Sequence, residues 1–348
     1  MSKVAVTGAS GYIATRLIET LLADPKIEKV LGFDVRPPEI TSEKFVFDQI
    51  DVRSPSLEAR LSGVDVLVHL AFIMDPIHDE SEMRDVNVNG SQNVFRSAGK
   101  AGVKKLIYTS SAVVYGAHPD NAVPLTEESP LRANLDFSYP AHKLEVEYVV
   151  REFQDEYPDA SVTVFRPAIV FGPHVDNAWS HLMEFPVLFG VKGYKPPLQF
   201  VHEEDVARAL SKTVVEDIPG VYNLAPDDWL ESNQIMSLLD RKRVDLPEPV
   251  AFAVAERLWS LGMAEAPAGM LHYVMHPWVV SAEKLKSTGF VCTYSSEETF
   301  RQVIERLQGR IRIGNRSVPK NQVAATAAAA GLVGAFFATR RVLRRRAA

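Results

Sequence analysis

The N-terminal stretch from residue 3 to residue 23 most strongly limits what this chain can fold into. Lys3 to Thr7 form a short apolar run, Gly8-Ala9-Ser10-Gly11-Tyr12-Ile13-Ala14 follows directly, and a helical pattern continues to about Ala23. This order predicts a strand, a glycine turn and a helix. Such glycines let backbone N–H groups approach a pyrophosphate, which then lies at the positive end of the helix. A purely structural turn would show the same glycines.

Further apolar runs follow at residues 28–34, 44–47 and 64–70, another begins at Lys105, and helical stretches separate them. This alternation is typical of an α/β fold with a parallel, doubly wound sheet. In such sheets ligands bind in the crevice outside the carboxyl ends of the strands. We therefore expect the functional side chains to come directly after strands.

Two acidic positions follow these runs. Asp34 ends the run at 28–34, where a carboxylate can accept both ribose hydroxyls and repel a 2′-phosphate. This favours NAD over NADP, although Arg36, two residues on, is compatible with NADP. Asp51-Val52 follow the run at 44–47, where a carboxylate could hold the adenine amine.

Tyr139 and Lys143 stand four residues apart at the start of a predicted helix, for which we expect Ser138 as the cap and Pro140 in the first turn. Side chains with this spacing lie on one helix face. A free tyrosine, with a pKa near 10, is a poor base at neutral pH. A nearby ammonium favours the phenolate, so Lys143 could bring Tyr139 into range as a general acid and base. An ordinary amphipathic helix could carry the same pair.

Taken together, the motifs resemble the extended short-chain dehydrogenase/reductase family, in its NAD-dependent epimerase/dehydratase branch. The resemblance covers about residues 3 to 225. Each motif is short, but their joint order is specific to the family. The matching segments are residues 7–14, Asp51-Val52, His69-Leu70-Ala71, 109–116, 139–143, 166–173 and 200–207.

The resemblance implies a Rossmann-type sheet, bound NAD and a role for each matching residue. It implies that Tyr139, Lys143 and Ser111 are catalytic. It implies cofactor contacts from Gly8, Ser10, Gly11, Tyr12, Ile13, Asp34, Asp51, Val52, Leu70, Ala71, Tyr139, Lys143, Pro167, Ile169 and Val170. His202 and Asp205 are expected to anchor a helix rather than react. The family also implies a homodimer through the helices near 81–101 and 139–157.

We expect residues 1–175 to form the dinucleotide-binding domain, which also receives about 200–225. Residues 176–308 are expected mainly as a substrate-binding lobe and 309–348 as a tail. Prolines interrupt the pattern from Asn177 onward, and side chains of aromatic residues and methionine are frequent there. Short helices are predicted at 179–188, 204–215, 233–240, 250–261 and 297–308.

Two departures from the family bear on the substrate. In nucleotide-sugar epimerases an arginine that clamps the diphosphate commonly stands four residues before the histidine of the Phe-Val-His segment. Leu198 occupies that position here, and leucine cannot replace a bidentate guanidinium. Phe137-Ser138 stand where the family often has an asparagine. The sequence therefore favours a less charged, more lipophilic alcohol or ketone over a UDP-sugar.

Composition limits the compartment and the partners. One cysteine, Cys292, excludes an intramolecular disulfide and fits a reducing, cytoplasmic compartment. No Cys/His pattern suggests a metal site, and the N-terminus shows no secretory signal. The net charge is −6, but it is unevenly distributed. Ten basic residues and no acidic residue follow Glu305. The preceding residues, with 28 basic and 44 acidic side chains, carry −16, which argues against nucleic-acid binding.

The tail from residue 310 to residue 348 needs a separate interpretation. Its uncharged stretch from Val323 to Thr339 is mostly alanine, and at about 1.5 Å per residue it is shorter than a ~30 Å hydrocarbon core. We expect a basic, modestly apolar helix on an anionic membrane surface. A short tail anchor and a loose solvated tail are the alternatives.

The resulting hypothesis is an NAD-dependent oxidoreductase that acts on a hydroxyl or carbonyl of a small, lipophilic, sterol-like substrate. The first alternative is a nucleotide-sugar epimerase or dehydratase in which NAD is recycled in place. Net reduction of added NAD separates the two. A second alternative, of another class, is a dinucleotide-binding sensor or membrane scaffold without turnover.

Overall fold

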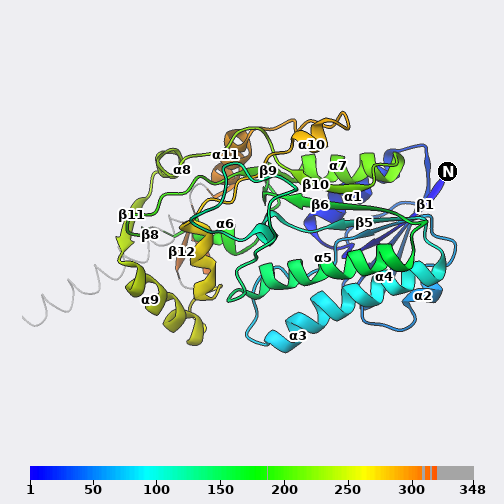
Figure 1. The fold of residues 1–348 in the computed structure, drawn as a ribbon, viewed down its shortest axis with the longest axis horizontal. Coiled ribbons are helices and arrows are strands. Elements are labelled where there is room, and N and C mark those ends of the chain that lie inside the picture. The colour runs from blue at the N-terminus through cyan, green and yellow to red at the C-terminus, as the bar shows by residue number, and fades with distance from the viewer. Residues whose placement is uncertain (186, 308–309, 314–315, 320–348) are drawn as a thin grey trace, which may run out of the picture.

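The computed structural model describes residues 1–185, 187–307, 310–313 and 316–319. A seven-stranded, all-parallel sheet forms its centre, in the order β10-β6-β5-β4-β1-β2-β3 (Figure 1). Its strands are β1 (Ser2–Thr7), β2 (Ile27–Asp34), β3 (Phe45–Gln49), β4 (Val66–His69), β5 (Lys105–Thr109), β6 (Ser161–Pro167) and β10 (Gly220–Leu224). The predicted doubly wound parallel sheet is therefore confirmed.

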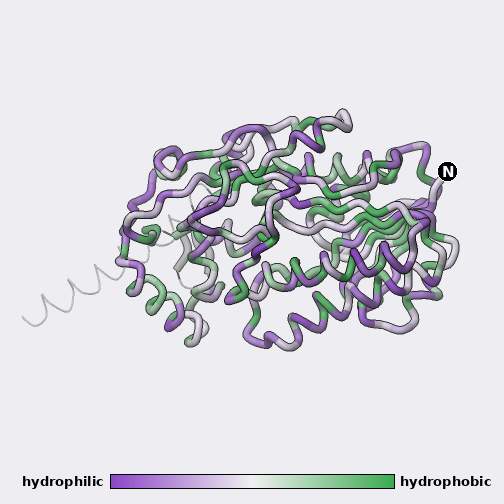
Figure 2. Tube along the Cα trace, in the orientation of Figure 1, coloured by the Kyte–Doolittle hydropathy of each residue, from purple (hydrophilic) through white to green (hydrophobic). Residues whose placement is uncertain are grey.

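Helices cover both faces of this sheet. α1 (Tyr12–Ala23) and α7 (Glu203–Val215) pack together on one face, and α2 (Leu57–Arg60), α4 (Gly90–Ala101) and α5 (Ser138–Glu156) cover the other (Figure 1). Successive residues of a strand point to opposite faces. Accordingly Val4 and Val6 belong to the apolar cluster under α1 and α7, while Ala5 belongs to the cluster under α4 and α5. Figure 2 shows the hydrophobic residues gathered along these central strands.

The helix predicted near 81–101 is divided by a π-helical turn. α3 (Glu80–Arg84) is followed by the turn at Asp85–Asn89 and then by α4. Asn87 in this turn is fully buried, accepts from the Ile73 N–H at 2.7 Å and donates to the Ile73 carbonyl at 3.0 Å. The π turn thus points an amide side chain at the loop after β4, in line with the frequent occurrence of such bulges at functional sites.

The segment after β6 contains shorter elements. They are β7 (Ile169–Phe171), α6 (Ala178–Leu182), β8 (Val187–Val191), β9 (Phe200–His202), α8 (Ser232–Leu239), β11 (Lys242–Leu246), α9 (Glu248–Ser260), a 3-10 turn at Ala268–Val274, α10 (Glu283–Lys286) and α11 (Ser296–Leu307). Another 3-10 turn, at Ala112–Tyr115, follows β5. The predicted helices near 204–215, 233–240, 250–261 and 297–308 are confirmed. The prediction of a helix over 179–188 is wrong in its second half, because Val187–Val191 pairs as a parallel strand with Lys242–Leu246.

The C-terminal region is described only in part. β12 (Arg310–Ile313) and β13 (Arg316–Pro319) pair as antiparallel strands. The predicted membrane-surface helix within 320–348 lies outside the described residues. Within the residues that are described, no helix has the length and apolar character to cross a membrane.

Candidate active site

The strand order reverses between β1 and β4, and the crevice opens where these strands end. Thr7 and His69, the last residues of the two strands, are register partners, and Thr7 Oγ1 is hydrogen bonded to His69 Nδ1 at 2.7 Å. His69 Nε2 is in turn bonded to Ser91 Oγ at 2.8 Å. Burial, with a smaller effect of Lys143, lowers the pKa of His69 to about 3, so this imidazole is neutral and structural.

The glycine turn after β1 leaves no room for a side chain. Gly8 has φ +71°, and a Cβ there would lie 2.6 Å from the Ala71 backbone nitrogen. Gly11 is the N-cap of α1 and donates its N–H to the Gly8 carbonyl at 3.0 Å. In the described chain no side chain caps the first turn of α1. This helix N-terminus, held against a bare backbone, fits the pyrophosphate of a dinucleotide.

Asp34 lies beside this turn at the end of β2. Its carboxylate accepts from the Ser10 N–H at 3.0 Å and from the Arg36 N–H at 3.1 Å, and the Ser10 hydroxyl donates to the Arg36 carbonyl. These bonds join the glycine turn to the strand end that carries the carboxylate. The carboxylate is thereby fixed beside the glycine turn.

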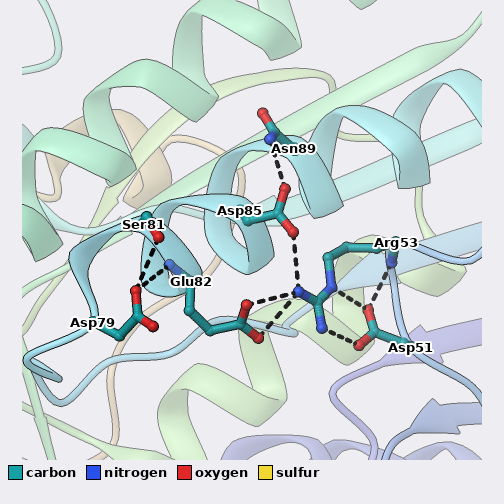
Figure 3. A network of polar contacts seen from close by, with 7 residues as sticks. All are labelled: Asp51, Arg53, Asp79, Ser81, Glu82, Asp85 and Asn89. Atoms are coloured by element: carbon teal, nitrogen blue, oxygen red, sulfur yellow. Dashed lines mark hydrogen bonds and ion pairs between the residues drawn. The ribbon is translucent and has the colours of Figure 1, made fainter.

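Asp51 lies in a polar network on the surface (Figure 3). The Arg53 guanidinium donates to both Asp51 oxygens at 3.0 and 2.7 Å, and this ion pair lowers the pKa of Asp51. Arg53 also pairs with Glu82 of α3 and with Asp85 of the π-helical turn, each at 3.0 Å. The structure thus places the Asp51 carboxylate in a link between β3 and α3, and Asp51 and Val52 do not line the cavity described next.

A cavity of about 190 Å³ brings most of the predicted site residues together. Of those residues, Gly8, Gly11, Tyr12, Ile13, Leu70, Ser111, Tyr139, Lys143, Pro167, Ile169 and Val170 line it, while Ser10, Asp34, Asp51, Val52 and Ala71 do not. Its remaining wall is largely apolar and includes Phe72, Trp179, Met270 and Trp278. Within the described chain no three or more His, Cys, Asp or Glu side chains form a group that could hold a metal ion.

Helix α5 positions Tyr139 in its first turn. The N-cap is the extended, buried Phe137, so the prediction of Ser138 as the cap is wrong; Ser138 is the first helical residue and donates its hydroxyl to the Glu80 carboxylate. Pro140 stands in the first turn as predicted. The Ser111 hydroxyl lies near Tyr139 and lowers its pKa, and Ser111 also caps the 3-10 turn that follows β5.

Lys143 is only 5% exposed, and its ammonium donates to the Thr109 carbonyl at 2.8 Å. It also lies 3.8 Å above the ring of Phe72, whose ring packs edge-on against that of Tyr139. Burial lowers the pKa of Lys143 to about 7, and the charge of Glu147 opposes that shift.

The protonation of Tyr139 differs from the expectation. Burial raises the pKa of Tyr139 to about 12, and the hydrogen bond with Ser111 only partly offsets this. The Lys143 nitrogen lies 6.0 Å from the centre of the Tyr139 ring and is bonded to a carbonyl. In this structure desolvation therefore outweighs the attraction of the ammonium, and the prediction that Lys143 lowers the pKa of Tyr139 is not met.

Sequence reasoning missed a buried ionic network beneath the site. Glu147, one turn after Lys143, accepts from Arg166 through both oxygens at 2.8 and 2.6 Å and from the Ser110 hydroxyl at 2.6 Å. Arg166 also donates to Tyr115 at 2.8 Å, and Tyr115 donates to Asn223 at 2.7 Å. The sequence signal for this network is Glu147, because Tyr139, Lys143 and Glu147 follow one another at intervals of four residues and therefore share one helix face.

The two residues expected to anchor a helix do so. His202 accepts from the Glu204 N–H at 3.1 Å as the N-cap of α7, and the Asp205 carboxylate accepts from the backbone of Thr293 and Tyr294. Neither side chain lines the cavity. Their predicted anchoring role is confirmed.

Comparisons with known proteins agree with this geometry. The sequence model of the NAD dependent epimerase/dehydratase family matches residues 4–225. An uncharacterized protein of Mycobacterium tuberculosis is 28% identical over 253 residues, which cover 70% of this chain and 67% of that protein. The N-acetyl-alpha-D-glucosaminyl-diphospho-ditrans,octacis-undecaprenol 4-epimerase of Escherichia coli O157:H7 is 36% identical over 175 residues, about half of either chain.

Solved structures share the fold. UDP-glucose 4-epimerase of Thermus thermophilus, in complex with NAD, has a TM-score of 0.69 at 19% identity, covering 88% of this chain and 99% of that one. UDP-glucuronic acid 4-epimerase of Bacillus cereus, in complex with NAD, has a TM-score of 0.68 at 18% identity, covering 88% and 98%. At such identities the likeness concerns the fold.

Proposed function

Because the chain belongs to the NAD-dependent epimerase/dehydratase family, we propose that it is an NAD-dependent oxidoreductase acting on a hydroxyl or carbonyl of a small, lipophilic, sterol-like substrate. Membership confirms the predicted family and, with it, NAD as the cofactor. The reaction class and the substrate are proposals. The observation that carries them is the convergence of Tyr139, Ser111 and Lys143 on one largely apolar cavity that also contains the glycine turn.

The residues of this chain fit a dinucleotide. The bare backbone at Gly8, the N-terminus of α1 and the Asp34 carboxylate would hold its pyrophosphate and adenosine ribose. Lys143 would bind the ribose next to the nicotinamide, because its ammonium lies on the same cavity wall as Tyr139. Bound NAD supplies or accepts the hydride.

The proton chemistry falls to Tyr139. In the proposed mechanism its hydroxyl exchanges a proton with the substrate oxygen, and Ser111 donates a hydrogen bond to the same oxygen. The position of both side chains on the wall of one cavity supports this. A positive charge on Lys143 would stabilise the phenolate that forms when Tyr139 acts as an acid.

Two features support an uncharged, apolar substrate. The side of the cavity formed by residues after 175 presents Trp179, Met270 and Trp278. Leu198, where nucleotide-sugar epimerases commonly have arginine, pairs its backbone with Leu230 at 2.9 and 2.8 Å and packs on the main apolar core. That position therefore offers no guanidinium for a diphosphate.

The alternative is epimerisation or dehydration of a sugar nucleotide. It is supported by the names of the Escherichia coli relative and of the two solved structures described above, all of which are epimerases. In that reaction NAD would be reduced and reoxidised on the same substrate, so no NADH would accumulate.

The test uses the purified full-length chain with NAD and either a 3β-hydroxysteroid or UDP-glucose. We expect NADH, followed by its near-ultraviolet absorbance, to accumulate in proportion to the ketone formed from the steroid. Interconversion of UDP-glucose and its epimer without net NADH would establish the alternative instead.

We also retain the proposed division into residues 1–175 with about 200–225, 176–308 and 309–348, and a homodimer through α4 and α5. These two helices lie side by side on one face of the sheet, and Tyr148 of α5 is 46% exposed (Figure 1). Light scattering of wild type and Tyr148→Glu tests the dimer, which the substitution should dissociate.

Cosedimentation with anionic vesicles, with and without residues 320–348, tests the proposed membrane contact.

A further inference from the structure

The charged side chains that line the cavity are unusually few. Among the lining residues that the structure describes, only Lys143 and Asp75 carry a formal charge. The Lys143 ammonium donates to the Thr109 carbonyl and lies above the Phe72 ring. Asp75 lies in the loop after β4, and its carboxyl group is the one acidic side chain among the described lining residues.

Further acidic groups lie near Asp75. Burial raises the pKa of Asp75, the Ala178 N–H and His181 lower it, and the charges of Glu265 and Asp176 raise it further. His181 is bonded through one ring nitrogen to Glu265 and through the other to Asp176, each at 2.6 Å. Two carboxylates, those of Glu265 and Asp176, bond the His181 imidazole, and the Asp75 carboxyl lies near this group. A region with three carboxyl groups and one imidazole disfavours a diphosphate.

Asp75 is held at one oxygen. Its Oδ1 accepts from the Ala178 N–H of α6 at 3.0 Å, which ties the loop after β4 to the segment beyond residue 175. The structure gives its Oδ2 no hydrogen-bond partner among the described residues. Burial is the main cause that raises the pKa of Tyr139, and the negative charge of Asp75 raises this pKa further.

We propose that Asp75 is a specificity-determining residue that accepts a hydrogen bond from a second hydroxyl or amine of the substrate. A carboxylate accepts hydrogen bonds and donates none, so its complement is a donor. The reacting oxygen of the substrate lies at Tyr139 and Ser111, its apolar body lies against Trp179, Met270 and Trp278, and its distal donor reaches Asp75. The substrate class is thus a phosphate-free apolar alcohol with a second donor. This inference rests on the proposed function.

The test compares two ligands on three proteins by calorimetric binding to the full-length chain loaded with NADH, which has no hydride acceptor for oxidation of the alcohols. The ligands are a 3β-hydroxysteroid with a second hydroxyl at the far end of the ring system and the same steroid without it. The variants are Asp75→Asn, whose amide oxygen still accepts from Ala178 but whose NH₂ replaces the free acceptor, and Asp79→Asn. Asp79 lies in the same loop, caps α3 and does not line the cavity, so Asp79→Asn controls for the loss of charge.

We expect wild type and Asp79→Asn to bind the dihydroxy steroid more tightly than the monohydroxy steroid. The Asp75→Asn substitution should lower the affinity for the dihydroxy steroid by at least about tenfold and leave the affinity for the monohydroxy steroid unchanged. Equal affinity of wild type for the two steroids, including undetectable binding of both, overturns the proposal, as does an unaltered preference in Asp75→Asn. Because binding is measured without turnover, a preserved preference without NADH formation would reject the oxidoreductase function and leave the assignment of Asp75 intact.

Discussion

Glu147 and Arg166 form a bidentate ion pair in which each side chain is only 3% exposed. The pair joins α5, one turn beyond Lys143, to β6, and through Ser110 to the end of β5. It therefore ties the two segments that carry the proposed catalytic residues, α5 and the end of β5, to β6. A buried pair of this kind adds little stability compared with apolar residues, but removing one partner leaves an uncompensated charge.

We predict that Arg166→Met lowers the free energy of unfolding by about 3–5 kcal/mol, because the Glu147 carboxylate is left buried without its partner. The double variant Glu147→Gln/Arg166→Met should recover a large part of this loss. Urea unfolding of both variants provides the measurement. Equal loss in the single and the double variant would contradict the account.

The stability of the protein should depend on pH through Lys143. Its pKa is about 7 in the folded chain and has the usual value of about 10.5 when unfolded, so between these values only the unfolded state binds the proton. The resulting penalty is full below pH 7 and is relieved as pH rises toward 10.5. Urea unfolding at pH 7, 8 and 9 should show wild type gaining stability relative to Lys143→Met, by at most about 1.4 kcal/mol per unit. A constant difference would place the pKa of Lys143 near its usual value.

Tyr139→Phe should lower the rate of substrate oxidation by about 10²–10⁴-fold, since it removes the proposed acid and base. NAD affinity should change little, because the ring and its packing on Phe72 remain. Tyr148→Phe, on the exposed side of the same helix, is the matched control. Wild-type turnover by Tyr139→Phe would reject the proposed mechanism.

The titration of Tyr139 is a separate prediction. With its pKa raised to about 12 by burial, this phenol stays neutral up to about pH 10 in the protein without added ligand. The ultraviolet difference spectra of wild type and Tyr139→Phe should therefore coincide between pH 7 and 10. Phenolate absorbance that is present only in wild type within this range would show that Lys143 lowers the pKa after all.

Two glycines with similar φ angles test the dinucleotide turn. Gly8 has φ +71° and lies against the Ala71 backbone, whereas Gly63 has φ +74° and open space within 4 Å of the point where a Cβ would stand. Gly63→Ala should cost about 1 kcal/mol of stability from backbone strain alone. Gly8→Ala should cost more and should weaken NAD binding at least tenfold in a calorimetric titration. Equal effects of the two would show that the contact at Ala71 does not matter.

Cofactor choice should depend on Asp34. Removing its carboxylate in Asp34→Ala takes away the acceptor for the ribose hydroxyls and the charge that repels a 2′-phosphate. We expect the ratio of NAD to NADP affinity to fall by about tenfold or more. Asp51→Asn, in the Arg53 network, tests the remaining sequence-based proposal of an adenine contact, because a loss of NAD affinity would support it.

The amino-acid sequence by itself determined the fold class, the family and the composition of the glycine turn. These properties follow from short-range patterns: apolar runs with strand periodicity, helical spacing between them, and motifs whose residues are neighbours in the chain. The convergence of Ser111 and Tyr139 was also predictable from the chain order. Both residues lie in the crossover between β5 and β6, and a crossover of this kind brings them to the same edge of the sheet. The helix expected near 179–188 failed because the pairing of Val187–Val191 with β11 is a long-range event that local propensity does not contain.

Only the tertiary structure decided the electrostatics of the site. The pKa of Tyr139 depends on how much water its hydroxyl loses, and spacing along a helix does not report burial. Glu147 and Arg166, and likewise Asp75 and Ala178, meet because separate elements pack together, and the Arg53 network holds Asp51 for the same reason. The sequence identifies the side chains that can exchange a proton. Packing sets the pKa values and charges of these side chains, and with them the kind of molecule that we expect the cavity to bind.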